Sequence, residues 1–322
     1  MKASNLNIPV LEKNKPTIVP TFHDVQTNPD TKRKLSAGFH CRDPFIMLYD
    51  NRYYLYQGAG EDGIICSVSD DLENWSDPVT VFAVPENFHG TKCLFWAPEC
   101  HYHNGYFYIF TSVWSKIHEH RVISVYRANN PLGPFEDIAN GCITPKDWDA
   151  IDGTLYVDDN GQPWMVFVHE WTSMPDENGG MCAAKLSEDF THFISEPIHL
   201  FYAKTPAWAT RGITDGCYLY TTDAGELLMI WSNFCENGYA VGLVKSESGK
   251  IEGPWVHCEN TVYQKGQKPQ FPEDGGHAMI FKTREGKTKM VLHSPNKSLP
   301  NGDYEHIVMY DVVEKNGLIE IE

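Results

Sequence analysis

The chain has 322 residues and a formal net charge of −17, from 43 acidic and 26 basic side chains. This balance argues against nucleic acid and anionic membrane surfaces as partners, because both are bound through clusters of Lys and Arg. With 42% hydrophobic residues the chain can bury a large core, and no apolar segment is long enough to span a membrane. A neutral ligand is compatible with this composition, and the oligomeric state is left open.

Residues 1–38 are polar, with four prolines and the basic cluster Lys32–Lys34. We predict that they form a coil that supplies a closing strand to the fold. Residues 39–322 are predicted to form one domain, because the pattern described below continues through them without a break.

The first 20 residues carry Glu12, Lys13 and Lys15 and no apolar stretch typical of a signal peptide. The nine cysteines are scattered, and no C-x-x-C pair suggests zinc or redox chemistry. These features predict a reduced, cytoplasmic location. A periplasmic or secreted protein whose leader has been removed would have the same sequence.

One pattern occurs five times along the chain: an acidic or small residue, an apolar run, a polar turn and a second apolar run. The expected inner hairpins run from 43 to 56, from 97 to 110, from 152 to 167, from 215 to 230 and from 276 to 291. Short aromatic-rich strands in a repeat of 54 to 63 residues are typical of one blade of a propeller. The predicted fold is therefore all-β, a five-bladed β-propeller with four antiparallel strands per blade.

The first residues of the repeats are Asp43, Ala97, Asp152, Asp215 and Gly276. In a propeller the same position of each blade reaches the same end of the central channel, so three carboxyl groups are expected to meet there. Each aspartate alone would be explained by a turn that binds its own backbone. Three converging carboxylates raise one another's pKa, and a pair of carboxyl groups acting as acid and base is the usual apparatus of a glycosidase.

Two other uses of three acids are a calcium site and a two-metal hydrolase. The chain contains no D-x-D-x-D-G loop for calcium and no H-E-x-x-H motif for zinc. Both uses therefore rank below glycoside hydrolysis.

Three segments, 42–46, 96–99 and 151–153, have the order and spacing of motifs in family 43 of the glycoside hydrolases, which the chain resembles over about residues 38–300. That family comprises five-bladed propellers, among them α-L-arabinofuranosidases, arabinanases and β-xylosidases. The resemblance implies an inverting enzyme that cleaves α-L-arabinofuranosyl or β-D-xylosyl linkages of plant-type polysaccharides or oligosaccharides. It makes Asp43 the general base, Asp215 the general acid and Asp152 the residue that adjusts the pKa of the acid.

One motif departs from the family. Its acid is usually a glutamate in Glu-Gly-Pro, whereas this chain has Asp215-Gly216-Cys217, and aspartate is shorter by roughly 1.5 Å. Alternative acids are Glu99, Glu170 and Glu236. The alternative function is a carbohydrate-binding propeller that lost hydrolysis through this change.

Several further residues are expected at the sugar subsites. They are Phe39, Trp96, Glu99, Trp114, His169, Glu170 and Trp171, with Trp208 as another aromatic candidate. His277 resembles the family's axial histidine, which lies near an ion or a water. The resemblance implies that no cofactor is required, and that calcium or another structural ion binds in the channel near His277, often through waters.

Overall fold

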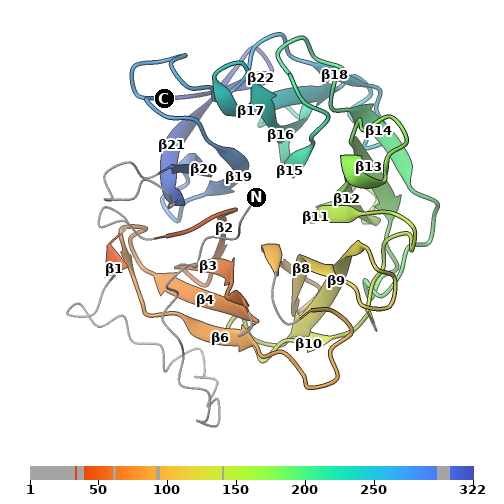
Figure 1. Ribbon diagram of the computed structural model, residues 1–322. Coiled ribbons are helices and arrows are strands. Elements are labelled where there is room, and N and C mark those ends of the chain that lie inside the picture. Colours follow the sequence, from red (N-terminus) through yellow and green to blue (C-terminus); the bar gives the residue numbers. More distant parts are fainter. Residues whose placement is uncertain (1–32, 35–39, 61–62, 92–94, 140, 296–304) are drawn as a thin grey trace.

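Five antiparallel sheets are arranged in a ring around a central axis, each radiating outward from it (Figure 1). The computed structural model describes residues 33–34, 40–60, 63–91, 95–139, 141–295 and 305–322. The predicted all-β, five-bladed propeller is confirmed. In the part of the chain so described, no helix is long and apolar enough to cross a membrane.

Blade one contains β2 (Phe45–Tyr49), β3 (Arg52–Gly58) and β4 (Ile64–Ser69), with β5 (Asn74–Trp75) and β6 (Val79–Phe82) sharing the outer position and β1 (Arg33–Lys34) beyond β5. Blade two contains β7 (Trp96–His103), β8 (Tyr106–Trp114), β9 (Arg121–Ala128) and β10 (Glu136–Asp137). Blade three contains β11 (Ala150–Val157), β12 (Pro163–His169), β13 (Gly180–Lys185) and β14 (Ile198–Tyr202), and the 3-10 helix η3 (Trp171–Ser173) follows β12.

Blade four contains β15 (Asp215–Thr221), β16 (Leu227–Cys235), β17 (Gly238–Ser246) and β18 (Trp255–His257). Blade five contains β19 (Gly276–Lys282), β20 (Thr288–Pro295), β21 (Glu305–Lys315) and β22 (Leu318–Ile321). Each blade is thus built from one continuous stretch of chain.

The ring closes where blade five meets blade one. His40 forms a bridge with His306, and the amide of Cys41 donates to the carbonyl of Glu305 at 3.1 Å. The closing strand expected from residues 1–38 stays a prediction: β1, the strand within the described part of this segment, pairs with β5 at the outer edge of blade one and not with blade five. Strand β1 therefore extends the blade that follows it in the chain.

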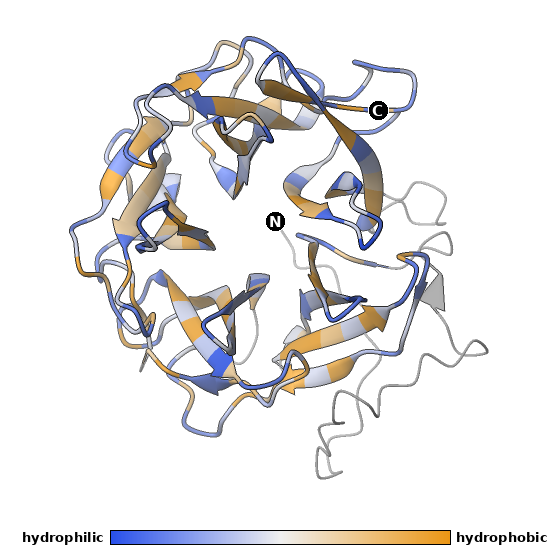
Figure 2. Ribbon diagram, turned by 180° about the vertical axis from the view of Figure 1, so that it is seen from behind, coloured by the Kyte–Doolittle hydropathy of each residue, from blue (hydrophilic) through white to orange (hydrophobic). Residues whose placement is uncertain are grey.

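The second strand of each blade packs against neighbours on both of its faces, which is why these strands are apolar at almost every position. All seven residues of β12 are buried, and in β16 Phe234 alone is half-buried while the others are buried. Figure 2 shows hydrophobic colouring concentrated on the strands and hydrophilic colouring on the loops between them. Burial between blades therefore supplies the core of the ring.

The inner strand of every blade begins with a residue of positive φ. The φ angles are 50° at Asp43, 42° at Ala97, 56° at Asp152, 48° at Gly216 and 50° at His277. In blades two to five the strand pairing shifts at this residue, which is a β-bulge. The bulge turns the backbone, so the residue that occupies it is directed differently from the rest of its strand.

The bulge corrects the repeat register that the sequence predicts. Asp215 and Gly276 lie one residue before the bulge, and the true equivalents of Asp43 and Asp152 are Gly216 and His277. The prediction of one shared position was wrong by one residue in blades four and five. Asp152-Gly153 and Asp215-Gly216 look alike as sequence, but the aspartate occupies the bulge in blade three and the glycine occupies it in blade four.

Hydrogen bonds across blade boundaries hold these bulges. The amide of Asp152 donates to Ser112 Oγ of blade two at 3.0 Å, and the amide of His277 donates to Ser232 Oγ of blade four at 2.8 Å. In the same way, the amide of Asp43 lies 3.2 Å from His293 Nδ1 of blade five. The amides at the positive-φ positions of blades one, three and five therefore find their acceptors on the preceding blade of the ring.

These contacts predict the cost of removing an acceptor. Ser112→Ala or Ser232→Ala leaves a buried amide without a partner, so each should lower the free energy of unfolding by about 1–3 kcal/mol. Denaturant unfolding followed by intrinsic fluorescence measures this change. The matched control is Ser67→Ala, because Ser67 is also buried in a strand but its hydroxyl makes no hydrogen bond within the described residues. Equal stability losses in all three variants would contradict the assigned role.

Candidate active site

His277 stands between the carboxyl groups expected to form the site. Its Nδ1 atom lies 3.2 Å from Asp43 Oδ1 and 3.8 Å from Asp152 Oδ2. Asp152 Oδ2 also accepts a hydrogen bond of 2.9 Å from the amide of Gly216, next to Asp215 in the chain. The positive-φ positions of blades one, three, four and five thus bring the three aspartates around one histidine, and the charge of Asp43 raises the pKa of both other aspartates.

Asp43 is the carboxyl group that stays ionised. Burial alone would raise its pKa, but His277, then His293, whose Nδ1 atom lies 3.3 Å from Asp43 Oδ1, and then Arg42 outweigh burial and lower the pKa well below its usual range. Arg42 Nε lies 3.5 Å from Asp43 Oδ2. His293, whose pKa is lowered by burial, is neutral and accepts from the Asp43 amide. Asp43 is therefore a carboxylate throughout the neutral range.

Asp215 has the opposite environment. Burial and the negative charge of Asp152 raise its pKa to about 7, although His277 and a hydrogen bond from Tyr239 act against this rise. The Tyr239 hydroxyl donates to Asp215 Oδ2 at 3.0 Å. Burial also raises the pKa of Asp152, with a further contribution from Asp43. Below about pH 7 the cluster therefore holds a carboxylate at Asp43 and a mostly protonated carboxyl group at Asp215.

The imidazole of His277 supplies the compensating positive charge. Burial would lower its pKa, but Asp43, Asp152 and Asp215 raise it. Among the described residues, no group of three or more His, Cys, Asp or Glu side chains is arranged to bind a metal ion directly. The cluster thus does not fit direct coordination of an ion, and the ion expected near His277 through waters stays a prediction.

Gly216 makes room for this imidazole. A Cβ atom built on Gly216 would lie 2.7 Å from Cγ and 2.8 Å from Cα of His277, and its φ of +48° is itself unfavourable for other residues. Two separate constraints therefore require glycine directly after Asp215.

Two of the other candidate acids lie close enough to act on the cluster, because the charge of Glu99 raises the pKa of Asp152 and His277 and the charge of Asp152 raises the pKa of Glu170. Glu99 is buried and its Oε2 atom lies 3.0 Å from His101 Nε2, further along the inner strand of blade two. Glu236 is exposed in the turn between β16 and β17. Glu170 Oε2 lies 3.3 Å from Arg121 Nε, and burial raises the Glu170 pKa to about 7 against the opposing charge of Arg121.

Arg121, which pairs with Glu170, also contacts two of the predicted aromatic residues. The guanidinium carbon of Arg121 lies 3.8 Å from the ring centre of Trp96 and 6.0 Å from that of Trp114. Trp96 directly precedes the bulge residue of blade two. This group, which we call the Arg121 cluster (Trp96, Trp114, Arg121 and Glu170), joins blades two and three beside the aspartates.

The remaining predicted residues lie at different places in the molecule. Trp171 is 37% exposed in η3. His169 is buried within blade three, where it stacks on Trp148 with ring centres 3.8 Å apart and its Nδ1 atom lies 3.2 Å from His199 Nε2. Within the described residues its side-chain partners are Trp148, Ser173 and His199, all in blade three or the segment before it, and not Asp43, Asp152 or Asp215. Phe39 lies outside the described residues.

Sequence reasoning missed three residues that shape the cluster: His293, Tyr239 and Arg121. His293 lies in β20 opposite Gly276, the place that Ser232 takes opposite Asp215 in blade four. Comparing these second-strand positions between repeats would have pointed to His293. Tyr239 and Arg121 come from third strands, for which the repeat carries no such signal.

Comparison with known proteins identifies relatives of the whole ring. The sequence model of the family described as "Glycosyl hydrolases family 43" matches residues 35–309. The crystal structure of an endo-arabinase from Bacteroides thetaiotaomicron VPI-5482 is similar, with a TM-score of 0.78 and 33% identity, over 88% of this chain and 98% of that one.

Two curated proteins are also similar. An extracellular exo-α-(1→5)-L-arabinofuranosidase of Cellvibrio japonicus (strain Ueda107) is 26% identical over 283 residues, which are 78% of each chain. An extracellular endo-α-(1→5)-L-arabinanase of Bacillus subtilis (strain 168) is 25% identical over 145 residues, 41% of this chain and 44% of that protein.

The names of these two relatives contradict the predicted cytoplasmic location, because both proteins are extracellular. The cysteine argument for a reduced compartment fails for a physical reason. Eight cysteines of the described residues are free thiols, and they are buried or half-buried at scattered places in the ring. Thiols held apart inside a fold stay unpaired in an oxidising compartment as well.

The site predicts a specific effect of Gly216→Ala. The added methyl group should push the imidazole of His277 away from Asp43, so the His277 pKa should fall as the histidine loses its carboxylate partners. Histidine-selective NMR titration measures this pKa. Gly225→Ala is the control, because its φ of +84° is equally unfavourable but its Cβ would meet nothing within 4 Å. A His277 pKa unchanged by Gly216→Ala would show that the ring is not held by this contact.

Proposed function

The chain belongs to glycosyl hydrolase family 43, and on this basis we propose that it hydrolyses α-L-arabinofuranosyl linkages of arabinan-type polysaccharides with inversion at the anomeric carbon. It is a glycosidase, and its substrate is a carbohydrate. The choice of arabinan is supported by the arabinan-cleaving activities named for its relatives, one of them 33% identical. Because the curated relatives are extracellular, we also propose that the enzyme acts outside the cytoplasm.

The mechanism is supported by one observation: in the same cluster the pKa of one aspartate is lowered and that of another is raised. Asp43 is held ionised, while the pKa of Asp215 is raised to about 7. Two carboxyl groups pushed apart in this way are suited to base and acid roles at the same pH. Asp43 takes a proton from a water as it attacks the anomeric carbon, and Asp215 gives its proton to the oxygen of the leaving sugar.

Asp152 and His277 act through these two groups. The negative charge of Asp152 keeps Asp215 protonated, and its hydrogen bond to the Gly216 amide holds the backbone beside the acid. The positive charge of His277 keeps Asp43 ionised. The reaction requires no cofactor, because water, a base and an acid supply every proton transfer of the hydrolysis.

Asp215 is a better acid than Glu170, although the pKa of each is raised to about 7. Asp215 lies among the charges of Asp43, Asp152 and His277, whereas Glu170 faces Arg121. We assign the Arg121 cluster to substrate binding instead, because a fixed guanidinium and indole faces suit a sugar ring and its hydroxyl groups.

Substitution of the two carboxyl groups separates their roles. Asp43→Asn should lower the turnover of every substrate by about 10²- to 10⁴-fold, because no base is left for the water. Asp215→Asn should do so on arabinan but spare an activated aryl arabinofuranoside, whose leaving group needs little protonation. Steady-state kinetics on both substrates, with proton NMR of the first-formed sugar, provide the measurement. A retained anomer, or Asp215→Asn cleaving arabinan at the parent rate, would reject the assignment.

The pH profile provides a second test. The acid must be protonated, so kcat/KM should fall as the pH rises above about 7, the value to which the pKa of Asp215 is raised. Tyr239→Phe removes a hydrogen bond that stabilises the Asp215 carboxylate, so the alkaline limb should move up by roughly one pH unit.

Asp152→Asn removes the negative charge that raises the pKa of Asp215, so the alkaline limb should move down. Shifts of both variants in the same direction would contradict the electrostatic account. If the alkaline limb of the pH profile moves in neither variant, another group donates the proton, and Glu170 is the next candidate.

A further inference from the structure

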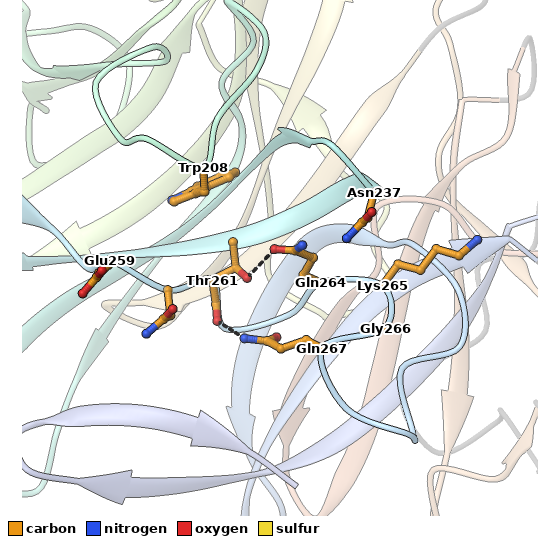
Figure 3. A pocket seen from close by; sticks show the side chains of 9 residues that line it. Trp208, Asn237, Glu259, Thr261, Gln264, Lys265, Gly266 and Gln267 are labelled. Atoms are coloured by element: carbon orange, nitrogen blue, oxygen red, sulfur yellow. Dashed lines mark hydrogen bonds between the residues drawn. The ribbon is translucent and has the colours of Figure 1, made fainter.

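A cavity of about 300 Å³ opens on blade four, apart from the aspartate cluster. Nine residues line it, and Figure 3 shows the indole of Trp208 across the pocket from Thr261 and Gln264. Asn237, Asn260 and Gln267 contribute three further amide groups. Its volume is at the lower end of the range for small-ligand pockets, which suits one or two sugar rings.

This pocket lies at the same end of the ring as the aspartates. Asp215 pairs with Ser232 near the end of β16, so the turn that carries Asn237 projects beyond the Asp215 end of the blade. The segment with Trp208 is held to this end, because the Thr210 amide donates to the carbonyl of Phe234 at 2.8 Å. Tyr239, which binds Asp215, is two residues from Asn237 and lies between the two sites.

The aromatic wall of the pocket is rigid. The Trp208 ring packs on Trp231 with centres 5.1 Å apart, and a Cβ atom on Gly242 would lie 2.2 Å from its Cζ2 atom. The indole therefore lies against bare backbone that only glycine provides. Its Nε1 atom is buried and has no hydrogen-bond partner within the described part of the chain.

The opposite wall is polar and ordered. Thr261 Oγ1 donates to Gln264 Oε1 at 3.2 Å, and Gln267 Nε2 donates to the Thr261 carbonyl at 2.9 Å. Lys265 is neutralised by Glu273, with Nζ and Oε2 3.4 Å apart. Glu259 adds a carboxylate to the lining and Lys265 is paired, so the pocket disfavours an anion; its fixed indole and amide groups suit the apolar face and the hydroxyl groups of a neutral sugar.

We propose that this pocket is a second carbohydrate-binding site, which holds a sugar unit of the neutral polysaccharide outside the catalytic site. The identity of the polymer rests on the proposed function; the site itself does not. A chain bound at both places is retained near the aspartates after one bond has been cut, because the second contact keeps its effective concentration high.

Affinity electrophoresis in gels that contain arabinan or xylan tests the proposal, with Asp43→Asn in every protein so that the polymer stays intact. Adding Asn260→Ala with Gln264→Ala should raise the polymer concentration for half-retardation about three- to tenfold, the effect of losing one or two hydrogen bonds. Adding Trp208→Ala should act in the same direction. Gln270→Ala is the matched control, an exposed amide outside the pocket that should leave retardation unchanged.

Thermal unfolding shows whether each variant is folded. If Trp208→Ala does not fold, the variant that combines Asn260→Ala with Gln264→Ala decides the outcome. Pocket variants retarded like Gln270→Ala, or a parent retarded by neither polymer, would overturn the proposal. Hydrolysis by the unaltered chain is measured separately. If the unaltered chain cleaves arabinan but the pocket variants bind the polymer as well as the parent does, the second binding site is rejected and the proposed function is kept. Cleavage and pocket-dependent retardation with xylan alone reject the arabinan assignment and support the pocket.

Discussion

The site depends on the residue of positive φ at or near the start of each inner strand, which occupies a β-bulge in blades two to five. This turn of the backbone brings Asp43, Asp152 and His277 from three different blades to the same level of the axis. A non-glycine residue at positive φ is unfavourable by itself. The surrounding ring offsets that cost, since an acceptor on the preceding blade receives the bulge amide in blades one, three and five. The closed ring and the reactive cluster are therefore parts of one hydrogen-bonded arrangement.

Burial acts on every group of this cluster, and the neighbours decide its outcome. Asp43 and Asp215 are both deeply buried, which alone would raise both pKa values. Asp43 faces the cations His277 and Arg42, so its pKa falls. Asp215 faces the negative charge of Asp152, so its pKa rises to about 7. Different charged neighbours in one buried site are therefore enough to make one aspartate a base and the other an acid.

Blade four carries more of the functional surface than its single aspartate suggests. Its inner strand bears Asp215, its third strand bears Tyr239, and the segments before and after the blade form the pocket around Trp208. Tyr239 is thus close in the chain to the pocket around Trp208 and in contact with the aspartate cluster. Gly216 also belongs to this blade, and the imidazole of His277 leaves no room for a side chain there.

The amino-acid sequence by itself determined the architecture and two of the three aspartate positions. Five repeats of alternating apolar runs and turns require blades, because strands of that length bury their apolar side chains only between neighbouring sheets. The tertiary structure alone decided the register in blades four and five, where the bulge lies at Gly216 and His277, one residue after Asp215 and Gly276. It also decided which aspartate is ionised, because His277, Arg42 and Tyr239 reach the cluster from separate strands and the pKa of a buried carboxyl group depends on such distances.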